Sequence, residues 1–165
     1  MNQTHIHLLV NHIPVLGVFF GASLLLYGII KKNTDTQLAA HVLLVIAALG
    51  AVITYVTGEP AEHTLKKFAD ASHHLIEEHE DAALYALIVM CVSGLFAAIS
   101  AYLIVMKDRL AERLGKVVIA IAFLAFIIIA RTAYLGGQIR HTETSNLSDK
   151  NYKEVSKEST EETEP

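Results

Sequence analysis

The sequence of 165 residues is poor in several residue types. It has one cysteine, no tryptophan and three prolines, and only 18% of its residues are charged. A single cysteine excludes an intrachain disulfide, and we expect Cys91, in the middle of an apolar segment, to be a small buried residue. The sequence lacks the GxxxxGK[ST] and GxGxxG loops that bind nucleotide phosphates and the GxSxG turn of acyl transfer. A net charge of −4 without a basic patch argues against a nucleic-acid partner.

Apolar residues, by contrast, are abundant. They make up 53% of the chain, with a mean hydropathy of +0.42, which is more than soluble domains of this size carry. Four apolar segments lie at about residues 8–30, 38–57, 82–106 and 115–139. Each has about the twenty residues that a helix needs to cross a hydrocarbon core of ~30 Å. Short connections at 31–37 and 107–114 force antiparallel neighbours. The sequence therefore predicts an all-α membrane protein, an up-and-down bundle of four transmembrane helices in contact with lipid.

Polar segments border this predicted bundle. The connection 58–81 is long and polar, and the tail 142–165 has few apolar residues and many Ser, Thr, Glu and Lys. Such a composition cannot bury enough apolar surface to order a chain by itself. We therefore expect one domain over residues 1–141, followed by a disordered tail.

Basic residues near the ends of the predicted spans are distributed unequally. One side has Lys31, Lys32, Lys107, Arg109, Arg113 and Lys116, and the other has Lys66, Lys67 and Arg140. Because basic residues are enriched on the cytoplasmic side of membrane proteins, we expect the connection 58–81 and both termini to lie outside. In a bacterium this predicts a multi-pass protein of the inner membrane with both termini in the periplasm.

Three histidines fall at span ends that an up-and-down bundle brings to one face. His12 lies near the start of the first span, His79 just before the third and His141 just past the fourth. Imidazoles from different helices can bind haem iron axially, or combine with carboxylates to hold zinc, copper or non-haem iron. Because the sequence has no CxxCH motif, a haem here would be of the non-covalent b type. His41 belongs to the opposite face, and we expect it to be a lone interfacial residue.

Other residues near the histidines suit either a haem site or a compact metal site. Arg131 lies about six residues, or roughly 9 Å, inside the outer end of the fourth span. An arginine at this depth is costly unless it snorkels, pairs with an acid or clamps an anionic group such as a haem propionate. Small residues on the helical face of His79 would leave a shallow wall for a flat macrocycle; they are Ala82, Ala83 and Ala86. Glutamates that could complete a compact metal site are Glu59, Glu62 and Glu78.

The first span carries glycines at regular spacing. Gly17, Gly21 and Gly28 follow one another at intervals of four and seven residues. This spacing gives one side of the helix a smooth face that allows close approach of a neighbouring backbone. Helix packing explains these glycines without a ligand.

Four short motifs together resemble a family. NHIPVLG in the first span, TGEPAEH after the second, IEEHEDAAL before the third and LGGQIRHTE at the end of the fourth are similar to a group of small bacterial four-helix inner-membrane proteins that resemble cytochromes b. The resemblance covers about residues 5–143. This chain differs from the simplest His-Pro form of that group in having Ile13 between His12 and Pro14. The resemblance implies that the residues with functional roles are His12, His79, His141, Glu59, Glu62, Glu78 and Arg140.

Three functional hypotheses follow. The first is a b-type haem protein that transfers electrons between a quinone and a partner protein, as an electron carrier or redox subunit more than a stand-alone enzyme. In it, His79 and either His12 or His141 are the axial ligands, with Arg131 and Arg140 beside the haem. The second is a non-haem site for iron, zinc or copper, made of the histidines and glutamates. The third is a structural accessory subunit, in a larger membrane complex or a homo-oligomer, whose Gly and Ala faces serve helix packing.

Overall fold

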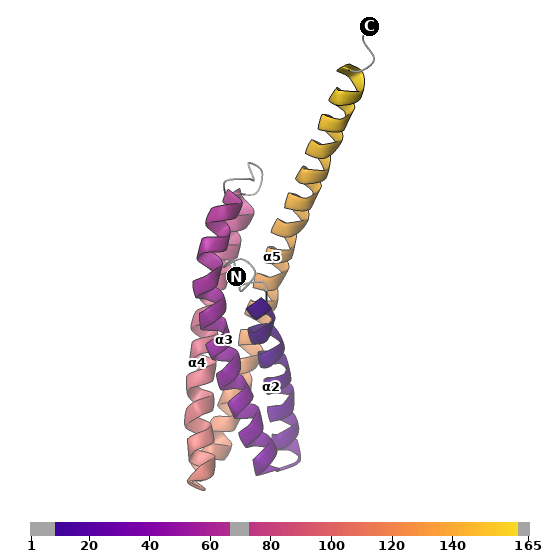
Figure 1. Ribbon diagram of the computed structural model, residues 1–165. Helices are drawn as coiled ribbons and strands as arrows, with labels where there is room; N and C mark the ends of the chain where they lie inside the picture. Colours follow the sequence, from indigo (N-terminus) through magenta and orange to yellow (C-terminus); the bar gives the residue numbers. More distant parts are fainter. Residues whose placement is uncertain (1–8, 67–72, 162–165) are drawn as a thin grey trace.

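The computed structural model describes residues 9–66 and 73–161, with side chains described for residues 9–58 and 74–139. Within these residues the chain is helical, with two short turns and no strand. The helices are α2 (His12–Ile30), α3 (Thr34–Lys66), α4 (His73–Val105) and α5 (Leu110–Glu161). They lie side by side with alternating direction, as Figure 1 shows. The predicted all-α, up-and-down four-helix architecture is confirmed.

Each helix contains a segment long and apolar enough to cross a membrane. The segments are His12–Ile30, Thr34–Gly58, His74–Val105 and Leu110–Ile139. At most 39% of the most apolar window in any of them is buried inside the bundle, so most of these side chains are exposed or only half-buried. Leu, Ile, Val and Phe side chains on such a surface need an apolar environment. The chain is therefore a multi-pass membrane protein in contact with the lipid bilayer.

The four helices form a closed ring. Each packs extensively on the next one in sequence, and α2 also contacts α5. The interior holds a few large side chains, among them Leu25, Leu44 and Met90, and many alanines. Because the large residues are few, the helices approach closely where small residues meet.

The glycine face of α2 packs directly on α3, as the sequence predicted. A Cβ added to Gly17 would lie 2.7 Å from the Cβ of Ala47, and one on Gly21 would lie 2.8 Å from Leu44 Cδ2. A similar contact joins α3 to α4, because a Cβ on Gly94 would overlap the Cβ of Ala48. These contacts also fix the register of the helices.

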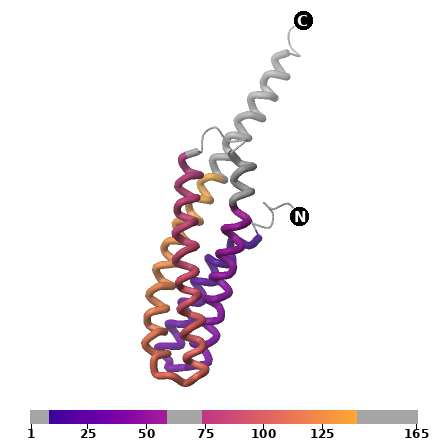
Figure 2. The backbone as a smooth tube through the Cα atoms, turned by 90° about the vertical axis from the view of Figure 1, so that its left-hand side faces the viewer, coloured from indigo at the N-terminus to yellow at the C-terminus, as the bar shows by residue number. Residues whose placement is uncertain are grey.

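The two short turns have the same construction and lie at the same end of the bundle (Figure 2). Lys32 and Lys107 have φ angles of 51° and 57°, the left-handed conformation that commonly ends a helix. The residue after each lysine donates its main-chain N–H five residues back, Asn33 to Gly28 and Asp108 to Leu103. We call this end, which carries Lys31, Lys32, Lys107 and Arg109, the basic end.

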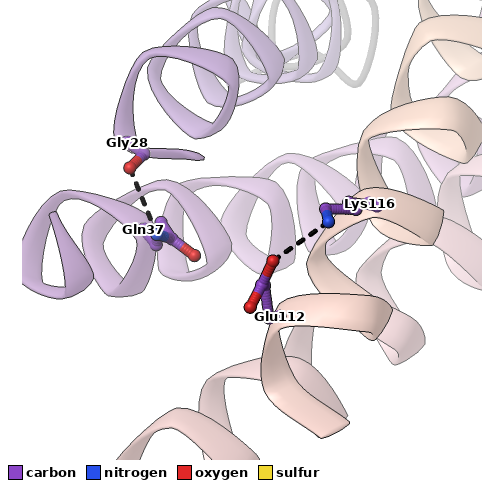
Figure 3. Close-up of polar contacts among 4 residues, drawn as sticks. All are labelled: Gly28, Gln37, Glu112 and Lys116. Carbon is purple, nitrogen blue, oxygen red and sulfur yellow. Dashed lines mark hydrogen bonds and ion pairs between the residues drawn. The ribbon is translucent and has the colours of Figure 1, made fainter. Parts of the chain in front are cut away.

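Side-chain hydrogen bonds then lead the chain into the next helix at the basic end. The Asn33 Oδ1 accepts from the main-chain N–H of Thr36 at 2.9 Å, which caps α3. The Gln37 Nε2 donates to the Gly28 carbonyl at 3.1 Å, and Lys116 pairs with Glu112 at 3.0 Å on α5 (Figure 3). Two side-chain hydrogen bonds therefore hold the turn between α2 and α3.

Two local features differ from the sequence analysis. The helix α5 continues through Glu161, where a disordered tail was expected. Residues that follow an existing helix extend it without the cost of nucleation, so composition alone underestimates helix here. Cys91 was expected to be buried but is exposed on α4. Many large apolar side chains of the spans are exposed as well, so an apolar setting does not imply burial.

Candidate cofactor site at the histidine end

His79 joins α4 to α5 at the end of the bundle opposite to the basic end. It is half-buried, and its Nδ1 lies 3.1 Å from the main-chain oxygen of Thr132. A carbonyl oxygen can only accept a hydrogen bond, so Nδ1 carries the proton and donates it. The lone pair of the neutral ring is then on Nε2, which makes Nε2 the nitrogen able to bind a metal.

Small residues shape the space around this imidazole. A Cβ added to Gly136 would lie 3.2 Å from His79 Cε1 and 3.6 Å from Nδ1, so the ring rests on the glycine. On α4 itself, the buried Ala82 and Ala86 follow His79 on the same face. The Thr132 hydroxyl donates to the Ile128 carbonyl at 3.0 Å within its own helix. The main-chain carbonyl of Thr132, and not its side chain, therefore positions His79.

His12 lies at the same level of the bundle as Thr132. The rings of Phe19 in α2 and Phe126 in α5 are in contact, with centroids 5.4 Å apart. The two helices are antiparallel, so two turns further His12 is level with Ala133. His79 and His12 therefore approach the same turn of α5 from two other helices. We call this region, defined by His12, His79 and the α5 segment 132–136, the histidine end.

The start of α2 is held in place although the His12 side chain is exposed. The Ile13 side chain packs at Gly50, where an added Cβ would lie 2.8 Å from Ile13 Cγ2. The hydroxyl of Thr54 donates to the Val10 carbonyl at 3.4 Å. Ile13, which separates His12 from Pro14, thus packs α2 on α3. The His12 side chain remains exposed at the edge of this α2–α3 interface.

The structure does not bring all the predicted site residues together. Glu78 is exposed, with Oε1 3.9 Å from Nδ1 of His74. Arg131 is exposed as well, on the stripe of α5 that carries Ile127 and Tyr134. Among the described residues, no group of three or more His, Cys, Asp or Glu is placed to hold a metal ion. The other predicted residues, whose side chains lie outside the described ones, are Glu59, Glu62, Arg140 and His141.

The residues that are described fit a haem in their chemistry. His79 packs on Gly136, with Nδ1 on the Thr132 carbonyl, and His12 is a second imidazole at the same level of the bundle. One or two imidazoles can hold a haem iron, whereas a compact metal site needs three or more donors.

Two features of the molecule escaped the sequence analysis. Thr132 stands in an apolar span like other small residues, and no sequence signal marks its carbonyl as the partner of His79. His41, expected at the interface, is completely buried between helices. Its position seven residues after the start of α3 was the available signal, because it places the side chain two turns inside the span.

Comparison of the chain with known protein families, curated proteins and solved structures gave no match. The fold defines a four-helix, multi-pass membrane protein.

Proposed function

We propose that the chain is a membrane-embedded b-type haem protein that transfers electrons and binds its haem at the histidine end. The observation that supports this is the hydrogen bond from His79 Nδ1 to the Thr132 carbonyl. In metalloproteins such a bond fixes the tautomer and the ring orientation of the ligand and raises the basicity of the other nitrogen. In this proposal the iron ligand is Nε2 of His79, the nitrogen that does not contact Thr132.

Each residue near His79 has its own role at the proposed haem site. His79 would hold the haem iron together with His12, which is level with the same turn of α5, or with His141 of α5 as the alternative. Gly136, Ala82 and Ala86 keep the walls beside the ligand flat. A bound haem would supply a one-electron carrier, and two histidine ligands would suit it to electron transfer.

We also propose a location in the cell and electron-transfer partners for the protein. The basic end carries four of the lysines and arginines that mark a cytoplasmic side, so the histidine end faces the periplasm of a bacterial inner membrane. The electron donor is a quinone in the bilayer or a redox protein at the surface. Arg131 is exposed on α5, and in this proposal its charge reaches the headgroup region or a haem propionate.

The test is the visible spectrum of the full-length protein purified in detergent, oxidised and then reduced with dithionite. We expect a sharp Soret band and, on reduction, α and β bands. His79→Ala should abolish these bands, while the matched variant His74→Ala should keep them, because the His74 side chain is 85% exposed on the preceding turn of α4. Retention of full haem by His79→Ala would refute the ligand assignment. A colourless protein with stoichiometric iron, zinc or copper by elemental analysis would favour the non-haem site instead.

A further inference from the structure

An open groove lies between α2 and α3 on the surface of the bundle. It has a volume of about 430 Å³ and is lined by Phe20, Ser23, Leu24 and Tyr27 of α2 and by Leu43 of α3. These residues belong to the two membrane-spanning segments His12–Ile30 and Thr34–Gly58. The groove is therefore accessible from the hydrocarbon of the bilayer.

The lining of the groove suits a hydrocarbon chain. Ser23 is the one small residue among the five, and it leaves a dent between the larger side chains of Phe20, Leu24 and Tyr27. Its hydroxyl already donates to the main-chain oxygen of Phe19 at 2.8 Å. Apart from the phenol oxygen of Tyr27, the remaining lining side chains are hydrocarbon. The groove itself thus selects for apolar chains and not for a polar ligand.

A lysine continues the groove towards the basic end. Phe20, Leu24, Tyr27 and Lys31 follow one another at intervals of four, three and four residues, which places them on one face of α2. Lys31 keeps a helical conformation, and its main-chain N–H donates to the Tyr27 carbonyl at 2.9 Å. It therefore lies one turn, or roughly 6 Å, beyond Tyr27. Its apolar stem can follow the surface while the ammonium reaches the headgroup region.

The ammonium of Lys31 is available for an anion. Among the described residues it makes no ion pair, not even with Asp35 in the first turn of α3. Lys116 of α5 differs, because its ammonium pairs with Glu112 at 3.0 Å (Figure 3). An apolar groove that ends at an unpaired cation is complementary to a molecule with a long hydrocarbon chain and an anionic head.

We propose that this groove binds an anionic phospholipid of the leaflet at the basic end, with one acyl chain between α2 and α3 and the phosphate at Lys31. Tyrosine is enriched where hydrocarbon meets headgroups, and Tyr27 lies at this level between the two parts of the site. Basic pockets between membrane-spanning helices are known binding sites for anionic lipid heads. The inference does not depend on the proposed haem, which belongs to the opposite end of the bundle.

The absence of tryptophan from the sequence allows a single reporter to be placed in the groove. Full-length Phe20→Trp is reconstituted in vesicles of phosphatidylcholine and phosphatidylglycerol, with one or the other lipid dibrominated. Bromine quenches tryptophan fluorescence on contact, so the two series give the relative binding constant of the anionic lipid at this position. We expect a preference of about fivefold for phosphatidylglycerol, the value of one lysine near an anionic lipid surface.

The matched reporter is Phe123→Trp on α5. Phe123 is exposed, and the Phe19–Phe126 contact places it within about 3 Å of the depth of Phe20. The paired Lys116 precedes it by seven residues on the same face. We expect no lipid preference at this position. Equal preferences at the two positions would overturn the proposal.

Two lysine variants in the Phe20→Trp background test the headgroup contact. Lys31→Gln should abolish the preference for phosphatidylglycerol. Lys107→Gln removes the same charge at the same end, but in the other short turn, and should keep it. Retention of the preference by Lys31→Gln, or an equal loss in both variants, would overturn the assignment of Lys31. Weak quenching of Phe20→Trp when both lipids are brominated would show that the groove is closed to lipid, which would also overturn the proposal.

Discussion

The imidazole of His79 in α4 donates a hydrogen bond to the main-chain carbonyl of Thr132 in α5, across a distance of 3.1 Å. This contact connects two helices that also pack extensively on each other. It also determines which nitrogen of His79 carries the proton. Substitutions of the residues packed against the His79 ring therefore test this arrangement.

Gly136 and Gly137 form a pair of neighbouring positions with different surroundings. Gly136→Ala would place a Cβ 3.2 Å from His79 Cε1, which obliges the ring to shift by a few tenths of an ångström, whereas a Cβ on Gly137 meets nothing within 4 Å. We expect Gly136→Ala to shift the Soret maximum and reduce the haem content, and Gly137→Ala to retain the wild-type spectrum. Identical spectra and haem contents in both variants would show that His79 does not need this contact.

The level of His12 is a second testable feature of the histidine end. The Phe19–Phe126 contact predicts that His12 faces Ala133 across the α2–α5 interface. In a background with Cys91→Ala, the pair His12→Cys and Ala133→Cys should react efficiently with a short bifunctional thiol reagent in membranes. The pair His12→Cys and Arg131→Cys is the control, because residues 131 and 133 are about 200° apart around the helix. Preferential cross-linking of the control pair would contradict the register.

The fold follows from the sequence to a large extent because lipid imposes a simple rule. Every backbone polar group must be satisfied within a span, so four apolar runs of sufficient length joined by short turns permit little besides an up-and-down bundle. The residues of closest approach were predictable for the same reason, since Gly17 and Gly21 do contact Ala47 and Leu44. Whether a residue such as Cys91 faces lipid or the interior was not predictable, because both faces of a span are apolar.

The site is less determined by the sequence than the fold. The antiparallel topology brings His12 and His79 to one end, and this was visible from their places at the span ends. Which atom holds His79 depends on the rotation of α5, and a main-chain carbonyl has no side-chain signature. The burial of His41 likewise depends on the angle at which α3 meets α4, which the spacing of apolar residues does not specify when apolar residues occur on every face.

The α3–α4 contact at Gly94 sets a strong steric limit. A Cβ at this position would overlap the Cβ of Ala48, so Gly94→Ala must push two helices apart. We expect a loss of about 1–3 kcal/mol in the free energy of unfolding, measured by SDS titration in mixed micelles with circular dichroism. Gly115→Ala is the control, since its nearest neighbours would be 4.0 Å away, and it should be neutral or stabilising by up to about 1 kcal/mol. A destabilisation of equal size in both variants would indicate a general intolerance of side chains at helix glycines.

The turn between α2 and α3 offers a prediction of the opposite sign. Lys32 has a φ of 51°, in the left-handed region that disfavours residues with a Cβ, and its main-chain N–H donates to Ile29. Lys32→Gly retains this hydrogen bond and removes the steric cost, so we expect stabilisation by about 1 kcal/mol in the same SDS titration. The neighbouring Lys31 has a φ of −81° and a ψ of −3°, an ordinary helical conformation. Lys31→Gly removes the same charge and should instead destabilise the protein by about 0.5–1 kcal/mol. Because the two variants share the loss of one positive charge at the basic end, a change of the same sign and size in both would attribute the effect to charge and would contradict the assignment of conformational strain to Lys32.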